Sequence, residues 1–342
     1  MSQPVPYEDP AEMFSYDNPA WCRDLMLHLR YSFRLTEYEL MAKKVASFLN
    51  KKITLPPPVS DNVAVSRDVE HLRTAGWCSV GQLLSPSKIK EVHKHFPTHD
   101  MRLTNDEILP TTKRAAVSTD INIAHYSKQV VVTAPHLARA ANHPDVLARV
   151  AGFLEAPPTI QYLASWWSFS GRDIAKDAQF FHYDKACYRF LKLFVFLTDV
   201  TMDTGPFCFV EGSCLPADWQ KRYDAIRHKD PDRAASLRSK LATQRRKDED
   251  ITAFFGRENI RYIQGKAGQA FLVNTAGFHK GVLPKTEDRL IFQALYTMLP
   301  TIKHGASRIK HQGYHHAIAS PGLVEEAYLR YVNRLIIDDP RS

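Results

Sequence analysis

From Thr159 onward the sequence consists of short aromatic and β-branched runs separated by turn residues, and this pattern most constrains the fold. The runs are TIQYLASWWSFS, QFFHYD, RFLKLFVFLTDV, FCFVEGS, GQAFLVNTA and RLIFQALYTML. Their length and composition are typical of strands, and turn pairs such as Gly205-Pro206 separate them. Many short strands in succession predict a barrel-like or sandwich β domain.

A helical extension precedes the predicted β domain. Apolar residues recur at helical spacing between Trp21 and Leu49, and a run of prolines follows. We therefore expect residues 1–60 to form a helical arm that packs on the domain or mediates oligomerisation. The β domain is expected over residues 61–300, and a C-terminal helical segment over residues 301–342.

Further helices are predicted at the start of the domain and within it. The run VEHLRTAGWCSVGQLLSPSKIKEVHKHF predicts a helix, a stop at Gly76, a short strand and a second helix that begins at Pro86. Pro144 similarly begins a predicted helix over DVLARVAGFLE. A charged helical insertion is expected between strands, at about residues 215–261.

Composition and charge indicate a globular protein and give no sign of a nucleic-acid-binding, disulfide-rich or membrane protein. Apolar residues make up 44% of the chain, enough for a packed core, and the net charge of +8 is spread along the sequence, so nothing points to nucleic acid. Five cysteines without C-x-x-C pairing argue against a disulfide framework or a zinc knuckle. The N-terminus lacks an apolar signal segment and no apolar run reaches the length of a membrane helix, so we expect a cytoplasmic protein without membrane contact.

The pattern His-x-Asp occurs three times, and one copy lies in a predicted strand. At His143 the pattern is explained by helix initiation, and another copy lies in a charged surface run. In contrast, His182 and Asp184 lie in the run FFHYDK, and residues two apart in a strand project from the same face. A buried carboxylate there needs a metal or an ordinary ion pair, for which Lys185 and Arg189 are candidates.

A third candidate ligand follows the strand GQAFLVN. His279 would complete a set of two imidazoles and one carboxylate, which leaves one face of an iron open, as in non-haem Fe(II) oxygenases. Ten residues later Arg289 begins another strand, where its guanidinium could bind a distal carboxylate in a bidentate pair. Singly, His279 is also explained as a loop histidine and Arg289 as a surface ion pair. Together, their order and strand context favour the site.

These motifs resemble the phytanoyl-CoA dioxygenase family of Fe(II)- and 2-oxoglutarate-dependent oxygenases. The resemblance rests on the H-Y-D run, LKLFVFLTDV, the DTGPF turn, VEGS, and NTAGFHKG followed by an arginine, and it covers roughly residues 65–300. It implies a fold that is mainly β with flanking helices, around a double-stranded β-helix core of the jelly-roll or cupin-like kind.

The same resemblance implies cofactors, residue roles and a reaction. His182, Asp184 and His279 would be the iron ligands at the catalytic centre. Arg289 would bind the C5 carboxylate of 2-oxoglutarate. The enzyme would use O₂ and 2-oxoglutarate, release succinate and CO₂, and hydroxylate an aliphatic C–H bond of a small-molecule substrate. Because Asp184 is a carboxylate, no position is freed for a halide, and hydroxylation is favoured over halogenation.

Three further residues are candidates for holding 2-oxoglutarate. Lys192 and Thr198 are predicted to share one face of the strand after the motif, and Gln179 precedes the motif. Lys192 could instead reach solvent, and Gln179 could end a strand at the surface. Some relatives carry a hydroxyl residue two positions after the distal histidine, where this chain has Gly281, so the arginine would have one fewer helper.

Two other functions stay open at this point. A cupin-like zinc or manganese hydrolase or isomerase would use the same two histidines and carboxylate, but it would leave Arg289 unexplained. A non-catalytic β-barrel binding module would need no metal. The insertion from Leu215 to Arg261 holds twelve Lys/Arg against eight Asp/Glu. As a lid over the site, it would suit an acidic substrate.

Overall fold

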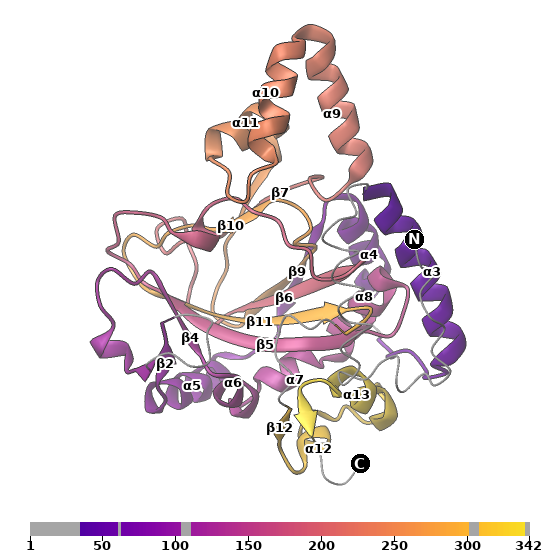
Figure 1. Ribbon diagram of the computed structural model, residues 1–342. Helices are drawn as coiled ribbons and strands as arrows, with labels where there is room; N and C mark the ends of the chain where they lie inside the picture. The colour runs from indigo at the N-terminus through magenta and orange to yellow at the C-terminus, as the bar shows by residue number, and fades with distance from the viewer. Residues whose placement is uncertain (1–34, 61–62, 104–110, 301–307, 339–342) are drawn as a thin grey trace.

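Two antiparallel sheets dominate the residues that the computed structural model describes, which are 35–60, 63–103, 111–300 and 308–338 (Figure 1). Within these residues the larger sheet has eight strands, in the order β1 (Trp77–Gln82), β9 (Gln269–Val273), β6 (Phe190–Phe196), β11 (Arg289–Thr297), β5 (Thr159–Ser168), β4 (Ile123–Tyr126), β2 (Met101–Arg102) and β3 (Thr111–Thr112). The smaller sheet has the order β10 (His279–Gly281), β7 (Phe207–Val210) and β8 (Ile260–Ile263).

Alternate residues of each strand line the space between the sheets. Phe194 of β6 stacks on Phe271 of β9, with ring centroids 5.2 Å apart, and Phe207 of β7 contacts both rings from the opposite sheet. The intervening residues of β6, such as Leu193, point to the other face and join the main core under the helices. This arrangement confirms the predicted mainly β fold with a double-stranded β-helix core.

Helices cover the outer face of the larger sheet (Figure 1). Helix α8 begins as its sequence predicts, because Pro144 occupies its first turn and His143 Nδ1 accepts a hydrogen bond from the Asp145 amide at 3.3 Å. It ends where Glu155 adopts a positive φ of 59°. The helices on this face are α4 (Ala64–Thr74), α5 (Pro86–His95), α6 (Lys128–Thr133), α7 (Leu137–Ala141), α8 (Pro144–Leu154) and α13 (Glu326–Asn333).

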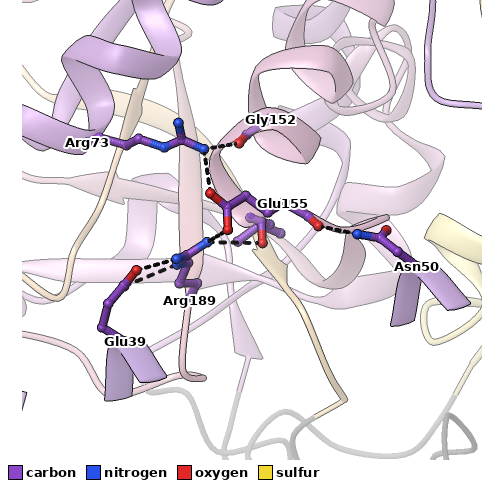
Figure 2. A network of polar contacts seen from close by, with 7 residues as sticks. Glu39, Asn50, Arg73, Gly152, Glu155 and Arg189 are labelled. Carbon is purple, nitrogen blue, oxygen red and sulfur yellow. Dashed lines mark hydrogen bonds and ion pairs between the residues drawn. The ribbon is translucent and has the colours of Figure 1, made fainter. Parts of the chain in front are cut away.

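Ion pairs fasten helix α3 (Leu35–Lys52) to the domain, as Figure 2 shows. Arg189, which directly precedes β6, pairs with Glu39 of α3, and its Nη1 lies 2.9 Å from Glu155 Oε2. The other carboxylate oxygen of Glu155 lies 3.0 Å from Arg73 Nη2 of α4. Asn50 of α3 donates a hydrogen bond to the Glu155 backbone carbonyl at 2.8 Å. The network therefore joins α3, α4, α8 and the start of β6.

The predicted N-terminal and C-terminal helices are present in part. Helix α3 corresponds to the second half of the helix predicted from Trp21 to Leu49. Residues 21–34 lie outside the described part of the chain. The C-terminal segment holds α13 together with α12 (Tyr314–Ile318), β12 (Ile309–Lys310) and β13 (Ile337–Asp338). No described helix is long and apolar enough to cross a membrane.

One predicted strand is wrong. The run QFFHYD forms only isolated bridges, between Phe181 and Arg246 and between His182 and His279. Its next backbone hydrogen bond runs from the Asp184 amide to the Thr275 carbonyl, at 2.8 Å. These contacts go to two separate segments, around Arg246 and over residues 275–279, and the run is extended without belonging to either sheet.

The charged insertion folds as three helices, α9 (Pro216–Lys229), α10 (Pro231–Leu241) and α11 (Asp248–Phe255), between β7 and β8. Figure 1 shows them on the side of β7 and β10 that points away from the larger sheet. Apolar residues of α10 and α11 bury Phe181, Cys208 and Phe278 from this side. The insertion thus supports the smaller sheet from behind.

Candidate metal centre

His182, Asp184 and His279 converge beside the inner face of the smaller sheet. One ligand atom from each side chain can be chosen so that all lie within 4.8 Å of one another. The two histidines form a reciprocal backbone bridge, with N to O distances of 3.0 and 2.8 Å, and their ring centroids are 4.2 Å apart. Residues almost a hundred positions apart are therefore brought together by two backbone hydrogen bonds.

A backbone carbonyl orients each imidazole. His182 Nδ1 lies 2.9 Å from the Phe180 carbonyl, and His279 Nδ1 lies 2.9 Å from the Gly277 carbonyl. Because a carbonyl can only accept, Nδ1 of each ring donates and Nε2 keeps its lone pair in the neutral tautomer. Burial, followed by the charge of His182, lowers the pKa of His279 to about 3, and burial also lowers the pKa of His182. Both rings are therefore neutral at neutral pH, as metal binding requires.

The residue before each histidine anchors it to the insertion. Phe181 and Phe278 point away from the candidate ligands into the apolar cluster of α10 and α11. Arg246, which follows α10, donates its amide to the Phe181 carbonyl at 2.9 Å, and its guanidinium lies 4.8 Å from the Phe278 ring centroid and 4.5 Å from that of Tyr183. The insertion thus fixes the backbone on which both imidazoles stand.

Asp184 forms its ion pair with Lys192. Its Oδ2 atom lies 2.7 Å from Lys192 Nζ and 3.5 Å from His279 Nε2. Burial opposes ionisation of the carboxyl, but the charge of Lys192 outweighs it and holds the pKa of Asp184 well below its usual range. The sequence-based candidates for this pair, Lys185 and Arg189, were wrong, because Arg189 faces α3 and Lys185 lies over the Tyr183 ring.

Arg289 is a buried cation without a carboxylate among the described residues. Its side chain donates from Nη1 to the Gly205 carbonyl and from Nη2 to Ser168 Oγ at 3.0 Å, while its Nε atom finds no acceptor there. Burial lowers the pKa of Arg289 to about 10, so the group stays charged at neutral pH. The neighbouring Asp288 pairs with Arg114 instead, at 2.7 Å. Such a guanidinium would be stabilised by the carboxylate of a ligand.

Two glycines shape the surroundings of this arginine. Gly205 has a φ of +80°, and a Cβ there would lie 2.4 Å from the Val282 carbonyl oxygen, so the turn that presents its own carbonyl to Arg289 requires glycine. At Gly281 a Cβ would lie 3.1 Å from Arg289 Nη2. The hydroxyl that contacts this atom comes from Ser168, at the end of β5.

The remaining sequence-predicted residues lie in different settings. Lys192 reaches the carboxylate of the candidate metal site, as described. Thr198 lies beyond the end of β6, and its hydroxyl accepts a hydrogen bond from the Leu290 amide at 3.1 Å. Gln179 is buried in a short 3₁₀ turn, where its Oε1 accepts from Asn122 Nδ2 at 2.7 Å and its Nε2 has no partner within the described chain. The structure thus brings Lys192 directly to the candidate ligands, whereas the hydroxyl of Thr198 serves the backbone.

Sequence reasoning missed several polar residues on the inner face of the larger sheet. Ser168 and Tyr162 of β5 lie on this face because they alternate with residues that point to the helices, and Gln293 of β11 donates to the Tyr162 hydroxyl. His125 of β4 lies beside Trp166, with ring centroids 5.7 Å apart. The period-two pattern in TIQYLASWWSFS could have indicated Tyr162 and Ser168 as a pair.

The candidate site lies within a match to a protein family. Residues 72–289 match the family described as phytanoyl-CoA dioxygenase (PhyH). The chain belongs to the phytanoyl-CoA dioxygenase family. Membership in it makes the protein an enzyme of the Fe(II)- and 2-oxoglutarate-dependent oxygenase type, with iron and 2-oxoglutarate as its cofactors. The matched range includes both histidines, the aspartate and the arginine described above.

Solved structures with a similar chain path include two enzymes from nogalamycin biosynthesis and HygX. The non-haem α-ketoglutarate-dependent carbocyclase SnoK from nogalamycin biosynthesis is 15% identical, with 79% of this chain and 96% of that chain covered and a TM-score of 0.47. The epimerase SnoN of the same biosynthesis is 18% identical, with coverages of 69% and 83% and a TM-score of 0.45. HygX from Streptomyces hygroscopicus, solved with nickel, 2-oxoglutarate and hygromycin B, is 17% identical, with coverages of 71% and 90% and a TM-score of 0.43. No curated protein sequence matches the chain.

Proposed function

We propose that this member of the phytanoyl-CoA dioxygenase family hydroxylates an aliphatic C–H bond of a small-molecule substrate and releases succinate and CO₂. His182, Asp184 and His279 hold the iron. The observation that carries this proposal is the convergence of two imidazoles with available Nε2 atoms and one carboxylate within 4.8 Å. Two histidines and one carboxylate suit Fe(II) and leave coordination positions open. Bound there, iron(II) would supply O₂ activation coupled to the decarboxylation of 2-oxoglutarate.

Arg289 binds the distal carboxylate of 2-oxoglutarate in this proposal. Its support is the buried guanidinium, 4% exposed, whose Nε has no acceptor within the described chain and whose Nη2 contacts only a hydroxyl. A planar fork of donors in this state matches a carboxylate in a bidentate pair. A zinc or manganese hydrolase, the other enzyme class open from the sequence, would leave this arginine without a role. A binding module would leave the paired histidines unexplained.

The substrate would occupy the space between the sheets. Aromatic and polar side chains of the larger sheet, such as Trp166, Tyr162 and His125, face this space from β5 and β4. Several basic residues of the insertion are already paired, for example Lys240 with Asp250 at 3.2 Å and Arg261 with Glu211 at 2.7 Å. The charge of the insertion therefore gives little reason to propose an acidic substrate.

Product mass tests the reaction type. The Fe(II)-loaded enzyme would be incubated with 2-oxoglutarate, ascorbate and a library of small aliphatic metabolites, under ¹⁶O₂ and in parallel under ¹⁸O₂. Hydroxylation predicts succinate formation and a product heavier by one oxygen atom that carries the ¹⁸O label. A product of unchanged mass, or one lighter by two hydrogens, formed together with succinate, would keep the oxygenase-type chemistry but contradict hydroxylation. Turnover without any consumption of 2-oxoglutarate would favour the hydrolase or isomerase.

A further inference from the structure

The ammonium group of Lys192 forms an ion pair with Asp184, the carboxylate that would also bind the metal. Its Nζ lies 2.7 Å from Asp184 Oδ2, and the same oxygen lies 3.5 Å from His279 Nε2, the atom that would ligate the metal. The lysine side chain is 12% exposed, so solvent does little to screen its charge. A cation held between His279 Nε2 and this oxygen would therefore have to share the oxygen with the ammonium group.

The fold holds Lys192 in this place. Leu295 of the central strand β11 pairs with Lys192 of β6 on one side and with Tyr162 of β5 on the other. Because paired residues share a face of the sheet, Lys192 and Tyr162 project from the same face. The Tyr162 hydroxyl is hydrogen-bonded to the lysine, and Gln293 donates to the same hydroxyl. Among the described residues, Asp184 is the one carboxylate within ion-pair distance of Lys192. The ammonium therefore has no second carboxylate to which it could turn when a metal binds.

We propose that Lys192 couples the binding of the metal to the binding of 2-oxoglutarate. This inference rests on the proposed function, and it assigns a role in metal binding to a residue that is not itself a metal ligand. A divalent cation alone must compete with the ammonium for Asp184 and is repelled by it at close range, so it binds weakly. In the proposed function, the oxo acid end of the dianionic 2-oxoglutarate would bring negative charge to the metal at Asp184, the partner of Lys192, while its distal carboxylate would pair with Arg289. Each of the two ligands therefore strengthens the binding of the other, by the same factor.

Co(II) is a suitable probe, because it can be titrated anaerobically. Its binding can be followed by its visible spectrum, without turnover. Dissociation constants for Co(II) would be measured with and without saturating 2-oxoglutarate, for the wild-type protein, for Lys192→Met and for Lys192→Arg. In the wild type we expect 2-oxoglutarate to tighten Co(II) binding by on the order of tenfold or more. In Lys192→Met, Co(II) alone should bind about tenfold more tightly than in the wild type, and the effect of 2-oxoglutarate should shrink. Lys192→Arg keeps the charge and should retain most of the coupling.

Two results would overturn the inference. If Lys192→Met binds Co(II) more weakly and keeps the full effect of 2-oxoglutarate, the lysine only orients Asp184. If both quantities are unchanged, the lysine has no part in either binding step. Lys192→Gln repeats the test with a polar neutral side chain should the methionine variant not fold. If the wild-type protein binds no Co(II) at all, the proposed function itself fails, and this outcome is distinct from a failure of the coupling alone.

Discussion

The guanidinium of Arg246 lies 4.8 Å from the ring centroid of Phe278, the residue that directly precedes His279. Its backbone amide also bonds to Phe181, the residue that directly precedes His182. One residue of the insertion thus contacts the anchors of both candidate metal-binding histidines. This arrangement makes the insertion part of the support of the site.

Replacing Arg246 by methionine should therefore weaken metal binding although the side chain is not a ligand. We expect Co(II) affinity to fall by roughly tenfold, as for other residues that orient metal ligands, and the free energy of unfolding to fall by about 2 kcal/mol through lost cation–π contacts and hydrogen bonds. Titration calorimetry and denaturant unfolding measure the two effects. Arg233→Met, which changes an exposed arginine of α10, is the matched control and should change neither. A lower stability with an unchanged Co(II) affinity would contradict a role in holding the site.

The candidate ligands themselves predict a sharper loss. His279→Gln removes an imidazole whose Nε2 faces Asp184, so Co(II) and Fe(II) binding should weaken by more than about a hundredfold, beyond what an orienting residue costs. His228→Ala changes the exposed histidine of another His-x-Asp pattern and should leave metal binding unchanged. Equal affinities in the two variants would show that the pattern at His182 and Asp184 binds no metal with His279.

Ser168 should contribute to the binding of 2-oxoglutarate. Its Oγ lies 3.0 Å from Arg289 Nη2, next to the position proposed for the distal carboxylate. Ser168→Ala should weaken 2-oxoglutarate binding by about tenfold, the worth of one hydrogen bond to a charged group, as measured by displacement in the Co(II)-loaded protein. A Cβ at Gly281 would lie 3.1 Å from the same Nη2 atom, closer than an ordinary van der Waals contact, so a serine there would have to displace the guanidinium and the double variant Ser168→Ala/Gly281→Ser should not recover the loss. No loss in the single variant would remove Ser168 from the site.

His125 predicts a pH dependence of stability. Burial lowers the pKa of His125 to about 4, below the ordinary value of about 6.5. The unfolded chain therefore takes up a proton as the pH falls through 6.5, while the folded chain does not until about pH 4. Stability from the neutral form is fully present above pH 6.5 and is lost on acidification, at up to about 1.4 kcal/mol per pH unit. Urea unfolding between pH 7 and 4.5 should show a steeper loss for the wild type than for His125→Asn, and parallel curves would contradict the buried neutral state.

The strand pattern and the motif order allowed most of the fold to be predicted. The aromatic and β-branched runs RFLKLFVF and RLIFQALY were predicted to be strands and form β6 and β11, and Pro144 marked the start of α8 as its local chemistry requires. The strand over QFFHYD was predicted wrongly, because its backbone partners, Arg246, His279 and Thr275, lie far away in the sequence. Local propensity contains no information on such pairings.

Only the candidate metal ligands and the arginine of the site could be predicted from the sequence. Two histidines, an aspartate and an arginine in a fixed order indicated metal and carboxylate binding. The ion-pair partner of Asp184 could not be predicted from the sequence. Lys192 stands on β6, whereas Asp184 lies in an irregular segment that passes beside this strand. Ser168 was missed because the period-two pattern of β5 gives only the face on which it lies, and its contact with Arg289 depends on the register between β5 and β11. Contacts made across a sheet follow from register, and register is set by the whole fold.

Anaerobic titration with Fe(II) and 2-oxoglutarate tests the central claim most directly. Chelation of the oxo acid by iron gives a weak visible charge-transfer band, which would be followed in the wild type and in Arg289→Ala. We predict a band in the wild type, and a requirement for at least about tenfold more 2-oxoglutarate in the variant, because a buried charged pair to the distal carboxylate is lost. Tight Fe(II) binding by the wild type without any such band would contradict the assignment of His182, Asp184, His279 and Arg289 to an oxygenase site.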